Sequence, residues 1–228
     1  MPHRALFASI VLAVLALACG PGDESNAPAD QPAGPRDPDV VMLVDDVEIR
    51  ATEVEALAAA VAALYPEYTP LHCRRVVLGG TLLPRAALAA RYAAPRREAE
   101  AASRRALEAL RTGAARGELV PTAIQGDISG LGLAFWTFAR DLVPGAWSGP
   151  LEQEGRFRLA RVARIERGPE PRADRVVAEI VDFSYVPAGP TAEVAAAATR
   201  AAQLTILDPA WEEAVPEILK IRMGGARR

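Results

Sequence analysis

The chain has 228 residues, of which 50% are hydrophobic, and its formal net charge at pH 7 is −3. A weakly acidic chain lacks the excess of positive charge with which proteins bind nucleic acids, so the composition argues against a nucleic-acid partner. Its two cysteines are Cys19 and Cys73. A disulfide within the part of the chain beyond Cys19 is therefore excluded, even in an oxidising compartment.

The first 18 residues have the pattern of a signal peptide, with Arg4 near the start and an unbroken apolar run over residues 5–18. At about 1.5 Å per residue this run falls short of the roughly 30 Å hydrocarbon core of a bilayer, so a permanent membrane helix is the poorer interpretation. The run ends in Ala16-Leu17-Ala18-Cys19-Gly20, which resembles the lipobox of bacterial lipoproteins. The resemblance implies lipidation of Cys19, a membrane anchor and a periplasm-facing place in the cell envelope, at the inner or the outer membrane. Ordinary secretion with cleavage near Ala18 is the alternative.

The segment that follows is rich in Pro, Gly, Asp and Ser and has no large apolar side chain between residues 20 and 38. Such a segment buries too little surface to offset its ordering entropy. We therefore expect residues 19–38 to form a flexible tether between the lipid and the folded part. About 190 residues remain, enough for one compact core or two small ones.

The folded part opens with two short β-prone runs around Asp45-Asp46, which predict a tight hairpin over residues 40–49. Thr52 then stands three residues before Glu55, the spacing of a capping box at a helix start. Apolar residues follow at intervals of three and four, on one face of a helix that ends before Pro66: Val54, Leu57, Ala58, Val61 and Leu64.

Two further helices are predicted. One runs from Leu71 to about Leu83 and breaks at Pro84, and the next runs from Pro95 to Arg111, with Gly113 as the residue that closes it. In the latter helix, five residues point toward a partner: Ala99, Ala102, Ala106, Leu107 and Leu110. The alternating Arg and Glu residues on its other face indicate a solvated, ion-paired surface.

From Gly126 onward the helical repetition gives way to Gly, Asp and aromatic residues. Residues 126–132, GDISGLG, resemble the Gly-Asp-Leu-Gly stretch of parvulin-type peptidyl-prolyl isomerases. Residues 139–151, ARDLVPGAWSGPL, are similar to the segment of that family in which a helix ends at Pro-Gly and a strand begins at Ser-Gly-Pro. Residues 154–162 resemble its closing hairpin and last strand. The hairpin at residues 44–49 and the helix after it also resemble the periplasmic SurA- and PpiC-like folding factors.

The resemblance implies an α+β fold. A SurA-like hairpin and helical arm would occupy residues 39–95, and a parvulin-like antiparallel sheet with helices packed on it would occupy residues 96–166. A C-terminal strand and helices would follow over residues 167–228.

The reaction implied by the resemblance is rotation about an X-Pro bond, over a barrier of roughly 18–20 kcal/mol. The family uses an apolar cup for the proline ring and polar groups around the twisting amide. Asp127 is the one catalytic residue that carries over, because the usual histidines are missing and Phe157 stands where the last strand's histidine is expected. The candidate substrate-binding residues are Leu131, Phe135, Trp136, Phe138 and Phe157. Aromatic residues at such spacing are more often ordinary core.

Two strands are predicted near the end of this region. Phe157 and Leu159 alternate with arginines, which indicates one buried and one wet face, and the pattern slips at residues 160–162, as at a bulge or a transition from edge to core. Residues 175–186 have apolar side chains on both alternating sets, as in a strand buried on both faces. We expect residues 176–186 to pair with residues 156–165, in the place of the first parvulin strand, which is missing here.

Helical signals close the sequence. Thr191 starts an Ala-rich helix that extends to about Leu204. Asp208-Pro209 then predicts an N-cap followed by proline at the first helical position.

His72 and Cys73 are neighbours, and no other histidine or cysteine follows Cys19. A zinc site needs three or four ligands, so we expect neither a metal nor a cofactor. Residues adjacent on a helix point in different directions, which argues against a catalytic pair. Cys73 is predicted to be a small buried apolar side chain.

Three functional classes follow from the sequence. The first is a membrane-tethered, parvulin-type isomerase that assists the folding of exported proteins, with unfolded or proline-containing polypeptides as partners. The second is a chaperone of the same fold that binds polypeptides without catalysis. The third is a structural lipoprotein of an envelope assembly.

Overall fold

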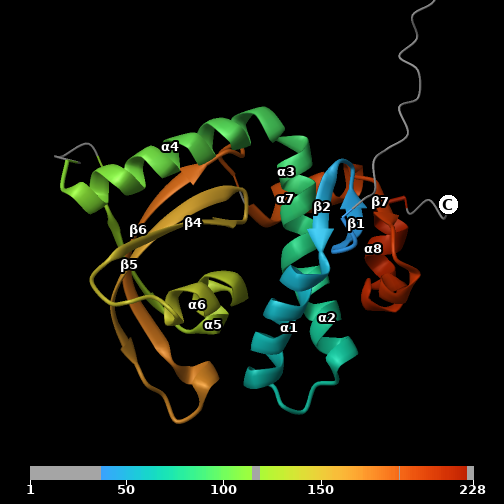
Figure 1. The fold of residues 1–228 in the computed structure, drawn as a ribbon, viewed down its shortest axis with the longest axis horizontal. Helices are drawn as coiled ribbons and strands as arrows, with labels where there is room; N and C mark the ends of the chain where they lie inside the picture. The colour runs from blue at the N-terminus through green and yellow to red at the C-terminus, as the bar shows by residue number, and fades with distance from the viewer. Residues whose placement is uncertain (1–36, 115–118, 190, 225–228) are drawn as a thin grey trace, which may run out of the picture. The chain divides into compact units, whose positions relative to one another are not determined.

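The computed structural model describes residues 37–114, 119–189 and 191–224. The predicted signal peptide, Cys19 and the predicted tether up to residue 36 lie outside these ranges. Within them the chain has the predicted α+β fold, with two antiparallel sheets and helices packed against them (Figure 1).

The smaller sheet contains the predicted hairpin. Strands β1 (Val40–Val44) and β2 (Val47–Arg50) pair in antiparallel fashion around Asp45, whose φ of +51° is one that Asp tolerates in a tight turn. Strand β7 (Leu204–Ile206) pairs with the free edge of β1, so the sheet has the order β2-β1-β7. A segment from the far end of the chain thereby completes a sheet that begins at residue 40.

The start of helix α1 (Ala51–Leu64) differs from the prediction. Thr52 is not the N-cap residue of a capping box; the cap position is Arg50, whose side chain makes no capping bond. Asp39 supplies the acceptors instead, since its carboxylate accepts hydrogen bonds from the Thr52 N–H (3.0 Å) and the Thr52 hydroxyl (2.7 Å). The predicted apolar face and the end of the helix before Pro66 are confirmed, with Leu57 only partly buried.

The predicted break at Pro84 is wrong. Helix α2 (Pro70–Val77), a π-helical turn (Leu78–Leu82) and helix α3 (Leu83–Arg91) follow one another without interruption. The π turn shifts the hydrogen-bond register, so that the Leu83 N–H donates to the Leu78 carbonyl. Pro84 then occupies the first turn of α3, where a missing N–H is tolerated. The centre of the helical part is therefore one long rod with a buried face.

Helix α4 (Ala93–Thr112) begins two residues before the predicted start and ends as predicted at Gly113, whose φ is +71°. Ala106 and Leu107 are buried against the larger sheet. The arginines and glutamates of its other face are exposed for the most part. Arg96 is the exception, because its side chain turns inward and forms an ion pair with Glu152.

The larger sheet consists of β3 (Thr122–Gly126), β4 (Trp147–Gln153), β5 (Arg156–Glu166) and β6 (Arg175–Ser184), in the order β3-β6-β5-β4. The predicted pairing is confirmed for residues 176–184, which pair with β5, and the strand ends two residues before the predicted Val186. An irregularity in that pairing lies between Val162 and Arg164, at the end of the stretch where the sequence pattern slips.

Both faces of this sheet are covered, which corrects the expectation of a wet face on β5. Helix α4 packs on one face, against Trp147, Leu159 and Val181. Helices α5 (Ile128–Leu131) and α6 (Leu133–Arg140) lie on the other, where Ala160 and Val162 are buried. The slip in the hydrophobic pattern reflects this two-sided burial.

The C-terminal part packs on the helical part of the fold. Helix α7 (Thr191–Ala201) packs on α3 and ends three residues before the predicted Leu204. The predicted N-cap is confirmed, since the Asp208 carboxylate accepts from the Ala210 N–H at 2.9 Å, but the element that it starts is a 3₁₀ helix, Pro209–Ala214. Helix α8 (Glu217–Arg222) closes the described chain.

Replacing Asp39 with Ala is expected to lower the free energy of unfolding by about 1 kcal/mol, because the first turn of α1 loses its acceptor. Urea-induced unfolding followed by tryptophan fluorescence measures the change. Glu55→Ala is the matched control, since Glu55 makes an exposed ion pair with Arg74, and its expected loss is below about 0.5 kcal/mol. A greater loss for Glu55→Ala than for Asp39→Ala would restore the capping box.

Candidate functional site

Asp127, the predicted catalytic residue, is the N-cap of α5. Its Oδ1 accepts hydrogen bonds from the Ser129 hydroxyl (2.6 Å), the Ser129 N–H (3.0 Å) and the Gly130 N–H (3.2 Å). The Ser129 hydroxyl and the Gly130 amide hold the pKa of Asp127 below its usual value. The carboxylate is therefore charged at neutral pH, and its evident task is to start a helix.

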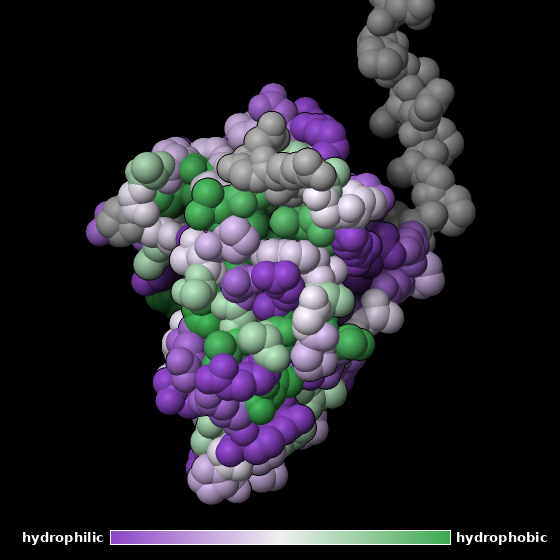
Figure 2. All heavy atoms as spheres, turned by 90° about the vertical axis from the view of Figure 1, so that its left-hand side faces the viewer, coloured by the Kyte–Doolittle hydropathy of each residue, from purple (hydrophilic) through white to green (hydrophobic). Residues whose placement is uncertain are grey.

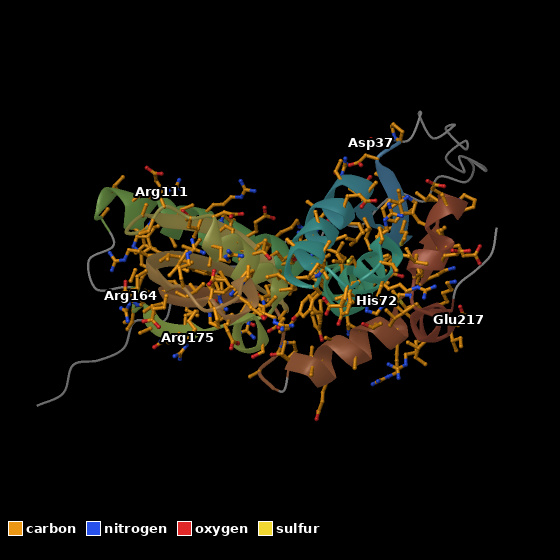
Figure 3. All side chains as sticks on the ribbon, turned by 90° about the horizontal axis from the view of Figure 1, so that it is seen from below. Asp37, His72, Arg111, Arg164, Arg175 and Glu217 are labelled. Carbon is orange, nitrogen blue, oxygen red and sulfur yellow. The ribbon has the colours of Figure 1, made fainter. Side chains whose placement is uncertain are left out.

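No histidine accompanies Asp127. The positive charge of Arg175 contributes to lowering the pKa of Asp127. Figure 3 shows His72 among the helices, well apart from Arg175 and Arg164 at the end of the larger sheet. His72 instead meets the Tyr68 ring edge-on, with ring centroids 4.3 Å apart. Asp127 and His72 thus form no polar pair.

The five predicted substrate-binding residues do not line one hollow. Phe135 and Trp136 are 0% and 1% exposed and form the centre of the cluster between α6 and the larger sheet. Leu131 and Phe138 are partly buried in the same cluster. Phe157 lies in a different cluster, with the Tyr185 ring at 5.8 Å. Side chains of the chain itself fill the space where a proline cup was predicted.

Trp136 is fixed by a polar contact that the sequence did not reveal. Its indole N–H donates to the Asp174 carbonyl at 3.1 Å. The buried Asp174 carboxylate accepts from Arg167 (2.7 Å) and the Gly168 N–H (3.0 Å), and Arg140 approaches it at 3.2 Å. Burial alone would raise the pKa of Asp174, but these donors outweigh it and hold the pKa below its usual value. The β5–β6 loop is thereby locked onto α6.

A cavity of about 500 Å³ lies beside the first residues of α6. We call it the sheet–helix cleft, because α3 and α7 form one side and the start of α6 and the β4–β5 turn form the other. Its lining residues are Gly80, Thr81, Pro84, Arg85, Leu88, Gly132, Leu133, Ala134, Glu152, Gln153, Glu154, Thr191, Ala192 and Ala195. None of the predicted substrate-binding residues is among them.

Glu152 is the most heavily bonded side chain of the cleft. Its carboxylate accepts from Arg96 Nε (2.6 Å), from Arg96 Nη2 (2.8 Å) and from the Tyr185 hydroxyl (2.8 Å). Burial raises the pKa of Tyr185, and the neighbouring Glu152 charge raises it further, so the phenol remains a proton donor at neutral pH. The Arg96 guanidinium also lies 5.6 Å from the centre of the Phe157 ring.

A second ion pair stands beside the first. Arg85 donates two hydrogen bonds to Glu53, at 2.6 and 2.8 Å, and so ties α3 to α1 at the cleft wall. Arg85 and Arg96 are both satisfied by carboxylates, and Tyr185 is satisfied by Glu152. Among the described residues, the polar groups of the cleft form no pair of nucleophile and base.

Cys73 is 1% exposed within the core of the helical part, which confirms the prediction of a small buried side chain. Among the described residues, no group of three or more His, Cys, Asp and Glu side chains is placed to hold a metal ion. Nor does any helix in those residues combine the length and the apolar character that a membrane span requires.

Comparison of this chain with protein-family models, with curated proteins and with solved structures found no match. The class that the structure defines is an α+β protein in which a four-stranded antiparallel sheet and a helical part enclose a cleft.

Glu152→Gln is expected to lower the free energy of unfolding by about 2–3 kcal/mol, because the half-buried Arg96 guanidinium loses its charged partner. Glu154→Gln is the matched control in the same turn. Glu154 is exposed, with no hydrogen bond to a described residue, and its change should stay within about 0.5 kcal/mol. Equal losses in chemical unfolding for the two variants would contradict the role given to Glu152.

Proposed function

We propose that this chain is an exported, membrane-tethered folding factor of parvulin-like architecture, which binds unfolded or proline-containing exported polypeptides in the sheet–helix cleft. The observation that carries the proposal is the strand order β3-β6-β5-β4. It supports the resemblance because β6 pairs with the strand similar to the last parvulin strand, in the place expected for the missing first strand.

The cleft suits a polypeptide whose sequence varies. Its size falls in the range of ligand-binding pockets, roughly 300–1,000 Å³. Pro84, Leu88, Leu133 and the alanines offer apolar walls, while the Thr81 hydroxyl offers a group that can bond to a peptide backbone. Such a surface favours an extended segment without demanding one particular side chain.

The described surface outside the cleft exposes few large apolar side chains. Five large apolar side chains are exposed on it. Ile218 and Ile221 share helix α8, and the other three come from separate elements: Val76, Val120 and Val143. On the face that Figure 2 presents, apolar residues in green alternate with charged residues in purple. The cleft is therefore the better candidate.

Binding without isomerisation is the favoured form of this function. Phe157 replaces the histidine expected in the last strand, and it is buried under Arg96. Phe135 and Trp136, which would have to receive the proline ring, are already enclosed. Arg85, Arg96 and Glu152 are committed to ion pairs, and Asp127 is the one residue carried over from the catalytic set.

The proposed membrane tether is inferred from the sequence alone. Cys19 would carry the lipid, and residues 20–38 would give the folded part reach from the membrane surface. A folding factor held in this way stays where exported chains emerge, facing the periplasm.

Filling the cleft is expected to weaken polypeptide binding. A Cβ added at Gly80 meets no atom within 4 Å, so Gly80→Leu places a side chain in the cleft without a clash. We expect the chain concentration that half-suppresses aggregation of a denatured, proline-containing client to rise about fivefold or more, equivalent to ~1 kcal/mol of binding free energy.

Gly130→Leu is the matched control for that experiment. A Cβ at Gly130 also meets no atom within 4 Å, and Gly130 lies on α5 outside the cleft. Its aggregation curve should overlay that of the unsubstituted chain. Equal suppression by Gly80→Leu and Gly130→Leu would remove the cleft from the proposal, and absence of suppression by the unsubstituted chain would remove the folding factor.

Isomerase activity is tested separately by NMR exchange spectroscopy on a proline test peptide, with and without the chain. We expect the cis/trans exchange rate to be unchanged. Acceleration that Asp127→Ala abolishes would replace binding alone with catalysis. Acceleration that survives Asp127→Ala would show that the catalytic group lies elsewhere.

A further inference from the structure

A second cavity, of about 390 Å³, lies at the opposite end of α7 from the sheet–helix cleft. It forms where the β1–β2 turn, the bend between α3 and α4, and the last turn of α7 meet. Seven of its thirteen lining residues are alanines: Ala87, Ala89, Ala90, Ala93, Ala198, Ala201 and Ala202. We call it the alanine-walled cavity.

The walls explain why the space stays open. Alanine carries a single side-chain carbon, so helices α3 and α7 pack closely and still leave the cavity unfilled. The alanines offer apolar contact and no polar group, so recognition has to come from the remaining lining residues. These are Val47 and five charged side chains: Asp45, Asp46, Arg91, Arg96 and Arg97.

Three of these charges have no hydrogen-bond or ion-pair partner among the described residues: Asp46, Arg91 and Arg97. Arg96 is committed to Glu152, and Asp45 accepts from the Gln203 N–H at 2.9 Å. Within the described residues, neither Asp46 nor Arg97 takes part in a hydrogen bond or an ion pair, so the two are not neutralised by each other. One wall of the cavity thus carries an uncompensated carboxylate and another an uncompensated guanidinium.

Helix polarity acts on the carboxylate wall of the cavity. Ala201 is the last residue of α7, whose negative end favours a cation on the side of the β1–β2 turn.

We propose that the alanine-walled cavity binds a short zwitterionic peptide, with its carboxylate at Arg97 and its ammonium at Asp46. Arg91, whose guanidinium lies 5.9 Å from the centre of the Tyr92 ring, is a further positive charge in the cavity lining. The small apolar body of the ligand lies against the alanines. This site is separate from the sheet–helix cleft and does not depend on the proposed folding function.

Alanyl-alanine is the probe, titrated into the full chain by isothermal calorimetry or by NMR shift mapping. We expect saturable binding, with shifts confined to residues of the cavity. N-acetyl-alanyl-alanine lacks the ammonium and alanyl-alanine amide lacks the carboxylate. Each should bind about tenfold more weakly or worse, since each leaves one charged contact unmade. No saturable binding, or equal binding of all three, would overturn the proposal.

Variants then locate the site. Arg97→Gln and Asp46→Asn should each weaken alanyl-alanine binding about tenfold, and Ala201→Phe should abolish it by filling the space, since Ala201 is exposed and the fold tolerates a larger side chain there. Arg105→Gln is the matched control: it is an exposed arginine on α4 outside the cavity and should leave the affinity unchanged.

Testing each site's variant in the other site's assay distinguishes a failure of this proposal from a failure of the proposed folding function. Gly80→Leu should leave dipeptide binding intact, and Ala201→Phe should leave aggregation suppression intact. Loss of dipeptide binding in Gly80→Leu or Arg105→Gln, or retention of it in Ala201→Phe, would place the ligand elsewhere and sink the proposal.

Discussion

The carboxylate of Glu152 is the contact on which the arrangement of the sheet and the helical part depends. It accepts hydrogen bonds from the Arg96 guanidinium on α4 and from the Tyr185 hydroxyl just after β6, at distances of 2.6–2.8 Å. A half-buried carboxylate is stable only when such donors replace water. Because Glu152 is on β4 beside the β4–β5 turn, these bonds also fix the wall of the sheet–helix cleft.

The opposite wall owes its shape to the uninterrupted rod of α2, the π turn and α3. Had Pro84 broken this helix, Arg85 and Leu88 would not face the cleft from one rigid surface. The π turn provides the change of hydrogen-bond register that admits the proline. Rigid walls on both sides suit the proposed holding function, in which a client would be bound by shape and apolar contact.

Local signals in the sequence predicted the features that local chemistry determines. The Asp45-Asp46 turn, the end of α4 at Gly113 and the N-cap at Asp208 each depend on a few neighbouring residues, and all three were found. Long-range partners were missed: Asp39 caps a helix that begins twelve residues later, and β7 joins β1 from the far end of the chain. The cleft was missed because its residues come from four distant segments and share no sequence pattern.

The fate of Phe157 explains why the predicted apolar residues do not form a site. On β5 its side chain points to the face covered by α4, where it meets Tyr185 and the Arg96 guanidinium. Phe135 lies on the opposite face, under Arg158, with its ring 5.0 Å from the guanidinium. The side chains of Phe157 and Phe135 therefore lie on opposite faces of the larger sheet. Two residues on opposite faces of a packed sheet cannot line one hollow. A histidine at position 157 would bring a group that can take up a proton close to an arginine in a buried place, and such a charge would be disfavoured. Phenylalanine suits this environment, so the polar chemistry is confined to Glu152 and its donors, at the edge of the cleft.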